Sequence, residues 1–366
     1  MKIDKNFVSG NIEVLNVSGD IVTLERELRD SSHDWFYWAF RVCDAANQTI
    51  TFRFPHQMRV GYWGAAYSHD LIHWNWTGKR ELGVDEEGIP YEAFTYTFGE
   101  DENEVYFAHN MVYIPERFNM FCAENNLTIE EFCVSNKGRS VPYIHFGNGE
   151  KKILLASRHH CCESPGTYVL ESVVKSLLDD PVEGFEVCCV PFVDYDGVID
   201  GDQGKHRAPH DHNRDYPRDG SESIYTTCAK LREYADEHQI IFAFDFHAPK
   251  HCGPIDSSDK AYICYNIEED IPLLDKFAQI FKSKITPDAI AYDPANNYYP
   301  NTGWNKSTNA TFARYMTYQP ENHLGFTLET PYFGEEDGSV LVNQNTLRAF
   351  GKCFADALRE YIREMF

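Results

Sequence analysis

The sequence lacks any apolar run long enough to cross a membrane. Its longest apolar stretches, such as 240–244, are far shorter than the roughly eighteen residues that a spanning helix needs. No apolar stretch follows the lysines of the opening residues, MKIDKNFVSGNIEV, so we expect no secretory signal. We therefore predict a cytoplasmic protein with no membrane association.

Positive charge is also scarce. The chain has 33 Lys and Arg against 57 Asp and Glu, which gives a formal net charge of −24. A protein this acidic repels phosphate backbones and anionic membrane surfaces, so we expect no nucleic-acid partner. A local pocket can still be basic, because net charge does not determine the charge of one site.

Cysteine pairs of the C-x-x-C kind are absent, although the chain holds 11 cysteines. A zinc site made of cysteines therefore has no support. Without a secretory signal, we expect most of these thiols to be reduced and buried.

Two domains are expected from the length of 366 residues. Residues 1–140 contain short alternating strands separated by Gly, Asp and Asn, which is typical of an all-β sandwich. Over residues 141–366 strands alternate with helices, which predicts an α/β domain with a mainly parallel mixed sheet flanked by helices. Sheets of this kind bind ligands at the carboxyl ends of their strands.

Metal-ligating side chains follow two of these strands. KILLASR leads into His160 and Glu163, which lie three residues apart and would share one face of a helical first turn. An imidazole and a carboxylate suit Zn²⁺, and His247, at the end of QIIFAFDFH, is a plausible third ligand. Each pattern alone is weak evidence for a metal site, because a capping glutamate or a packed structural histidine would give the same sequence pattern.

A long polar loop, residues 194–217, lies between these two motifs. Long ordered loops are usually functional. Its Asn213-Arg214 pair can bind a carboxylate through the two-pronged guanidinium, and Lys205 and Arg207 add positive charge.

A carboxylate stands within the late apolar strand GFTLETP. Burial there would raise the pKa of Glu329, which suits a general base. The alternatives are a glutamate at the solvent end of the strand or a structural ion pair.

In this order, H-x-x-E, N-R, a strand-end His and a late F-T-L-E, the motifs resemble the zinc carboxypeptidases of the carboxypeptidase A type over roughly residues 140–366. SHDWFYWAFRV, EAFTYTFGEDENEVYFAHNMVY and DGVIDG resemble the cytosolic carboxypeptidase subgroup and its bacterial relatives. The resemblance therefore covers nearly the whole chain.

This resemblance implies one zinc ion per chain, held by His160, Glu163 and His247. Glu329 would be the general base and acid. Asn213 and Arg214 would hold the terminal carboxylate of the substrate.

Other family positions stay open in this sequence. The family arginine that polarises the scissile carbonyl aligns nearest to Gly204, so Lys205 or Arg207 would supply the charge. Arg314 or Lys306, ahead of the base strand, would add a cation to the side-chain pocket and favour acidic C-terminal residues. The alternative is that Arg314 lies on a helix face and pairs with a surface carboxylate. The substrate-binding tyrosine would be one of Tyr298, Tyr299, Tyr315 and Tyr318.

The predicted function is a zinc-dependent metallocarboxypeptidase that hydrolyses the C-terminal peptide or isopeptide bond of a peptide or protein tail. One alternative is a zinc-dependent deacylase of N-acyl amino acids, similar to the aspartoacylase branch of the superfamily. The leading β-domain and the motif-rich loop argue against it. The other alternative is a peptide-binding module without catalysis, against which the retention of Glu329 and all three expected ligands argues.

Overall fold

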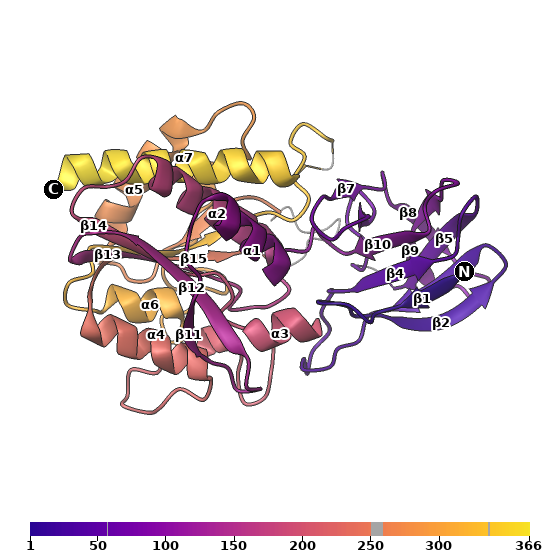
Figure 1. Cartoon of the computed structure of the whole chain (residues 1–366), viewed down its shortest axis with the longest axis horizontal. Helices are drawn as coiled ribbons and strands as arrows, with labels where there is room; N and C mark the ends of the chain where they lie inside the picture. Colours follow the sequence, from indigo (N-terminus) through magenta and orange to yellow (C-terminus); the bar gives the residue numbers. More distant parts are fainter. Residues whose placement is uncertain (57, 250–258, 336) are drawn as a thin grey trace.

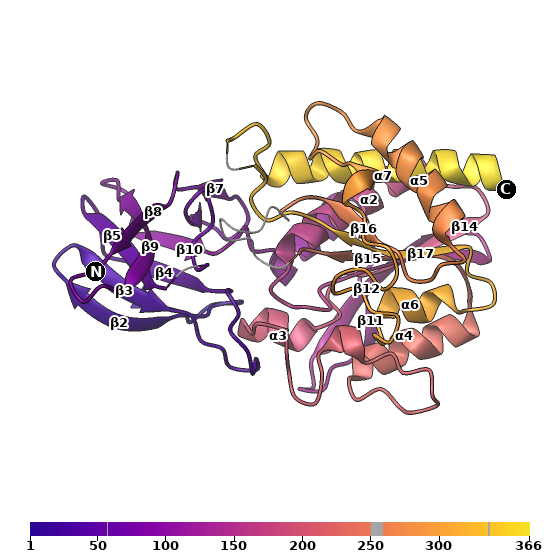
Figure 2. The same cartoon turned by 180° about the vertical axis from the view of Figure 1, so that it is seen from behind.

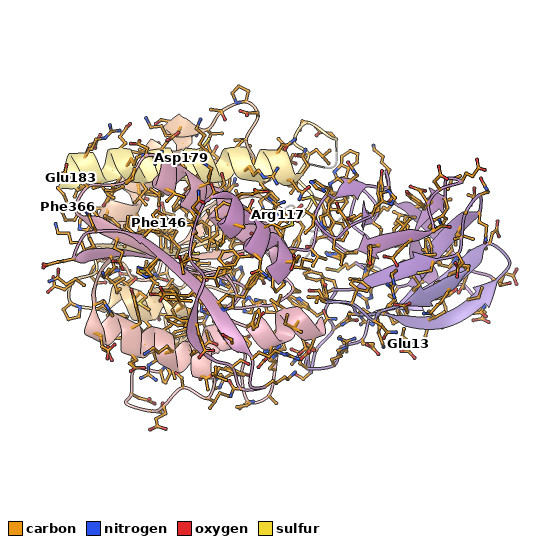
Figure 3. All side chains as sticks on the ribbon, in the orientation of Figure 1. Glu13, Arg117, Phe146, Asp179, Glu183 and Phe366 are labelled. Carbon is orange, nitrogen blue, oxygen red and sulfur yellow. The ribbon has the colours of Figure 1, made fainter. Side chains whose placement is uncertain are left out.

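The computed structural model describes residues 1–56, 58–249, 259–335 and 337–366. Figure 1 shows two parts, with small β-sheets at one end and a larger body of helices around a sheet at the other. In Figure 3, Glu13 lies in the first part, and Phe366 lies at the far end of the second.

The N-terminal part holds two five-stranded sheets, ordered β1-β4-β10-β6-β7 and β2-β3-β5-β9-β8. Phe40 and Phe107 from the first sheet and Phe52 and Phe94 from the second belong to one buried cluster, so the two sheets share a core. The strands are β1 (Lys2–Asp4), β2 (Glu13–Ser18), β3 (Ile21–Glu25), β4 (Ala39–Cys43), β5 (Thr49–Pro55), β6 (Ala66–Ser68), β7 (Asn75–Trp76), β8 (Glu81–Val84), β9 (Pro90–Thr97) and β10 (Glu104–Ala108).

The second part is built on a seven-stranded sheet ordered β11-β12-β14-β13-β15-β17-β16. Its four central strands, β14, β13, β15 and β17, are parallel, and antiparallel strands extend both edges. The strands are β11 (Glu130–Val134), β12 (Ser140–Gly147), β13 (Lys151–Ser157), β14 (Phe185–Val190), β15 (Gln239–His247), β16 (Tyr262–Cys264) and β17 (Leu324–Glu329). The prediction of a mixed α/β fold is confirmed.

Helices cover both faces of this sheet. Figure 1 shows α2, α5 and α7 on one side and α4 and α6 on the other. Successive strand side chains alternate between these faces, so that Ile153 and Leu155 join one buried cluster while Leu154 and Ala156 join the other. The helices are α1 (Pro115–Glu124), α2 (Ser164–Asp179), α3 (Tyr195–Asp200), the 3₁₀ turn η1 (His212–Arg214), α4 (Thr226–Glu237), α5 (Ile271–Lys284), the 3₁₀ turn η2 (Pro294–Asn296), α6 (Phe312–Thr317) and α7 (Gln344–Met365).

The predicted domain boundary at residue 140 stays a proposal. Strand β11 pairs with β12 in the large sheet, so a boundary at 140 would divide this hairpin. A boundary after β10 would keep the hairpin whole.

The two parts meet beside α3, which both views place at the end of the large body that faces the small sheets (Figures 1 and 2). Ser9 Oγ donates a hydrogen bond to Val198 O at 2.6 Å, and Asn11 Nδ2 donates one to Gly201 O at 2.7 Å. Among the described residues, no helix has the length and apolar character needed to cross a membrane.

One close approach at the edge of the sheet is made possible by a glycine. Gly166, in the first turn of α2, lies against the end of β15, where an added Cβ would come within 2.7 Å of Phe246 C and O. The absence of a side chain at Gly166 therefore lets the first turn of α2 approach the end of β15.

We expect Gly166→Ala to destabilise the protein by about 1–3 kcal/mol, because overpacking forces backbone shifts of that cost. The free energy of unfolding in denaturant measures it. Gly99→Ala is the control, since a Cβ there meets nothing closer than 3.6 Å. Equal stability of the two variants would contradict the packing argument.

Candidate metal centre and substrate cavity

Three buried side chains converge at the carboxyl ends of neighbouring parallel strands. His160 and Glu163 follow β13, and His247 is the last residue of β15. His247 Nδ1 lies 3.1 Å from His160 Nδ1 and 2.7 Å from Glu163 Oε2, and His160 Nδ1 lies 2.9 Å from Glu163 Oε1. Two nitrogens and a carboxylate within this space form a set of donor atoms that could hold a metal ion.

The local geometry corrects one expectation. His160 and Glu163 lie in a turn ahead of α2, closed by the hydrogen bond from Glu163 N to His160 O at 3.1 Å, and not in the helix itself. Glu163 occupies the N-cap position, yet its side chain makes no capping hydrogen bond. The capping role considered for this glutamate is therefore wrong, and its carboxylate faces the histidines instead.

Carboxylates support the outer nitrogens of both histidines. Asp245 Oδ2 is hydrogen-bonded to His247 Nε2 at 2.6 Å. Asp211 Oδ1 lies 3.4 Å from His160 Nε2, close enough for a charge contact, although neither atom has a hydrogen-bond partner within the described residues. A carboxylate at Nε2 favours a proton there, which leaves the Nδ1 lone pair free for a metal. The donor set and its outer partners therefore fit zinc, which takes nitrogen and oxygen ligands.

A second potential metal set, His159, Asp245 and His247, is engaged internally. His159 Nδ1 lies 2.7 Å from Asp245 Oδ1, and its Nε2 lies 2.8 Å from Tyr216 OH. With both nitrogens in hydrogen bonds, His159 supports Asp245 rather than offering a ligand.

Burial and charge act in opposite directions on Glu163. Burial alone would raise the pKa of Glu163, but His160, Lys205 and His247 lower that pKa well below its ordinary value. The group therefore stays ionised, as a metal ligand must.

Glu329 ends β17 beside the metal set, with its Cα paired to that of His247 in the parallel register. The side chain is buried, and its Oε2 has no hydrogen-bond partner within the described part of the chain. Burial raises the pKa of Glu329 to about 7, with His247 opposing the rise and Glu163 adding to it. A buried carboxyl with a free oxygen and this pKa can exchange protons near neutral pH.

These groups line a cavity of about 340 Å³. Its lining includes His160, His247 and Glu329 from the strand ends and Asn213 and Arg214 from η1. All the expected ligand, base and carboxylate-binding positions except Glu163 thus reach the cavity directly.

Asn213 and Arg214 differ in how far their side chains are already occupied by contacts within the protein. Asn213 Oδ1 accepts a hydrogen bond from Phe312 N at 3.1 Å, which fixes the amide. Arg214 Nη1 donates to Asn213 O at 2.8 Å, and no carboxylate pairs with Arg214 among residues 1–56, 58–249, 259–335 and 337–366. Its guanidinium can therefore receive an anion.

The structure separates the two cations left open in the loop. Lys205 lines the cavity, with its Nζ 3.7 Å from Glu163 Oε1. Arg207 lies outside the lining, enclosed by Asp30, Asp194 and Asp202. Burial alone would lower the pKa of Arg207, but Asp194 and Asp30 raise it above its ordinary value. Arg207 is therefore a structural ion-pair centre in this geometry.

Gly204 itself cannot carry a side chain without rearrangement. Its φ is +75°, and an added Cβ would lie 2.5 Å from Cys161 N. The position that the resemblance places nearest to a polarising arginine is thus closed by the backbone, and Lys205 is the neighbouring cation that lines the cavity.

Arg314 lies behind the cavity wall rather than in it. Its guanidinium donates to the backbone oxygens of Asn266, Lys306 and Asn309. Burial lowers the pKa of Arg314. The residue braces the amide-rich wall formed by Asn266, Asn305 and Asn309.

The cavity rim includes residues that the sequence did not single out. Trp35 comes from the N-terminal part, and Trp304 comes from the loop before α6. None of the four tyrosines considered for substrate binding lines the cavity. Trp304 is half exposed and occupies the rim in that region.

The chain is similar in structure to a metallo-carboxypeptidase from Burkholderia cenocepacia, at 19% identity and TM-score 0.79 over 100% of both chains. It is also similar to a metallo-carboxypeptidase from Pseudomonas aeruginosa, at 17% identity and TM-score 0.78, again over 100% of both chains. That structure is a complex with (2-guanidinoethylmercapto)succinic acid.

In sequence, the chain is 22% identical to bovine cytosolic carboxypeptidase 3 over 99% of this chain and 40% of the bovine protein. It is 25% identical to an uncharacterised Zymomonas mobilis protein over 49% of this chain and 48% of that protein. The chain thus spans less than half the length of these relatives. No protein-family model matches it. The metallo-carboxypeptidase fold inferred from the motifs is confirmed over the whole chain.

We expect purified protein to hold about one zinc per chain, with three protein ligands as in catalytic zinc sites. His160→Ala should weaken zinc binding by more than the roughly 10–100-fold typical of losing an outer partner. Metal analysis after dialysis against a weak chelator measures this. His145→Ala, an exposed histidine on β12, is the matched control. Full zinc content in the His160 variant would overturn the ligand assignment.

Proposed function

We propose that the chain is a zinc-dependent carboxypeptidase that removes the C-terminal residue of a peptide or protein tail in the cytosol. The observation that carries the proposal is one cavity lined by His160 and His247 of the His-Glu-His set, by the buried Glu329 and by Arg214. Within the described residues, Glu329 Oε2 has no hydrogen-bond partner and Arg214 has no acidic partner. These are the parts that hydrolysis next to a terminal carboxylate requires.

Substrate binding falls to Arg214 and Asn213. The guanidinium would receive the terminal carboxylate in a two-pronged, charge-assisted contact. Arg214 also donates to the backbone oxygen of Asn213, which restricts its position. A peptide held by its terminal carboxylate presents its last peptide bond toward Glu329 and the metal set.

Proton transfer falls to Glu329. When bound, zinc would polarise the scissile carbonyl and lower the pKa of water toward neutrality. Glu329 takes the proton of the attacking water and later delivers it to the leaving amine. Its raised pKa suits both steps, because proton transfer is most efficient when the pKa lies near the working pH.

Charge on the carbonyl oxygen falls to Lys205. Among the two cations considered, only Lys205 reaches the cavity, since Arg207 is held among three aspartates. An ammonium in a partly buried site stabilises developing negative charge strongly.

A preference for acidic C-terminal residues is a further part of the proposal. Arg314 brings a buried positive charge to the back of the amide-rich wall, where its guanidinium donates hydrogen bonds to oxygens of Asn266, Lys306, Asn309 and Asn305 rather than to carboxylates. Arg314 would act on a bound substrate through its electrostatic field and not through a direct hydrogen bond, so its effect on the preference for acidic residues should be modest.

We expect Glu329→Gln to keep zinc and fold while losing hydrolysis by about 10²–10⁴-fold, since glutamine cannot accept the proton. In the wild type, Glu329 must be ionised to act, and burial raises its pKa to about 7. The value of kcat/KM should therefore fall as pH drops through about 7, or lower where bound zinc favours the ionised form. A variant with near wild-type activity would point to another base.

We expect Arg214→Ala to weaken kcat/KM for free peptides by about 2–5 kcal/mol, the cost of removing one partner of a buried charge pair. Wild-type protein should cut C-terminally amidated peptides poorly. Arg218→Ala, just after this loop and outside the cavity lining, is the control. Leu-ended and Glu-ended peptides and N-acetyl amino acids complete the panel, so that it also reports acidic preference and deacylase activity. Equal cleavage of free and amidated peptides would exclude an exopeptidase of this kind.

A further inference from the structure

We propose that Asp30 and Trp35 of the N-terminal part position Lys205, so that the small β-sheets complete the catalytic site. This inference rests on the proposed function, in which Lys205 stabilises the carbonyl oxygen. It concerns two residues that lie outside the catalytic half of the chain.

Asp30 fixes the backbone that leads into Lys205. Its Oδ1 accepts a hydrogen bond from Gln203 N at 2.8 Å, and its Oδ2 accepts one from Gly204 N at 3.0 Å. One carboxylate therefore holds two successive peptide groups immediately before the lysine. Gly204 at φ +75° makes this turn possible, because it is the left-handed conformation that glycine adopts without strain.

The residue after Lys205 is held from the same side. The backbone oxygen of His206 accepts hydrogen bonds from Ser32 N at 3.1 Å and Ser32 Oγ at 2.7 Å. The His206 ring packs on His33 with ring centroids 4.6 Å apart. Lys205 is thus flanked by contacts to one short N-terminal segment, residues 30–35.

Trp35 then limits where the lysine side chain can go. The Lys205 ammonium lies 5.6 Å from the Trp35 ring centroid, over a tryptophan that is only 8% exposed. The same ammonium lies 3.7 Å from Glu163 Oε1. A lysine has a long flexible stem, so an aromatic face on one side and a carboxylate on the other restrict it to the cavity.

Other contacts between the two parts do not involve the lysine. Ser9 Oγ binds Val198 O, and Asn11 Nδ2 binds Gly201 O. If the N-terminal part only stabilised its neighbour, losing Asp30 or Trp35 should resemble losing one of these contacts. If it positions Lys205, the loss should depend on Lys205 being present.

The experiment is a double-mutant cycle on zinc-loaded protein. Asp30→Asn, Trp35→Leu and the conservative Trp35→Phe are each made alone and with Lys205→Ala, and kcat and KM are measured on one good peptide substrate. Ser9→Ala is the control for loss of an unrelated contact between the parts. Unfolding curves verify that every variant is folded.

We expect Asp30→Asn and Trp35→Leu to lower kcat by about tenfold or more with smaller changes in KM, while Trp35→Phe and Ser9→Ala stay within about threefold. In the Lys205→Ala background the first two changes should cost less than about twofold further, since there is no lysine left to position. If Asp30→Asn and Trp35→Leu lowered kcat by the same factor with and without Lys205, the proposal would be overturned.

A second measurement does not depend on catalysis. The rate at which acetic anhydride labels Lys205, read by mass spectrometry against the other lysines of the same sample, should rise several-fold in Asp30→Asn and Trp35→Leu and stay constant in Ser9→Ala. Unchanged labelling in all variants would also overturn the proposal. If the wild type cleaved no peptide and the variants still showed this labelling pattern, the proposed function would be refuted while the positioning of Lys205 would stand.

Discussion

The parallel pairing of β13, β15 and β17 is the constraint on which the site depends. It places the ends of three strands at one edge of the sheet, where His160, Glu163, His247 and Glu329 meet although they are far apart in sequence. Gly166 lets the turn before α2 approach the end of β15 closely. A shift of one residue in this register would turn a functional side chain to the opposite face of the sheet.

Much of the site could be predicted from the sequence because its residues stand at the ends of apolar strands, which are visible in the sequence. Buried apolar strands predict where the carboxyl ends lie, and His160, Glu163, His247 and Glu329 each stand at or just beyond one. The fold resemblance inferred from these motifs is confirmed by the structural comparisons. The ligand and base roles themselves remain proposals that rest on the geometry.

What sequence could not supply is the outcome of contacts between distant segments. Lys205 and Arg207 stand two residues apart with similar charge, and only tertiary structure separates them: three aspartates enclose Arg207, while Lys205 faces the cavity. Trp35 gave no signal, because a tryptophan in an aromatic-rich strand region is typical of a core. Asp211 stands near the Asn213-Arg214 pair, but nothing in the loop pattern shows that it faces His160.

The acidic character of the chain makes local charge placement decisive. With a net charge of −24, the protein repels anions at long range, yet Lys205 and Arg214 both line its cavity, where Glu329 is the one carboxylate among the described lining residues. Two carboxylates of this region are engaged by other groups: Glu163, buried beside Lys205, contacts the histidines, and Asp30 accepts hydrogen bonds from the backbone before Lys205. Asp30 accepts hydrogen bonds from that backbone and forms an ion pair with Arg207. It can therefore fix the loop without forming an ion pair with Lys205. The same contact that joins the two parts of the chain therefore leaves the positive charge of Lys205 facing the cavity.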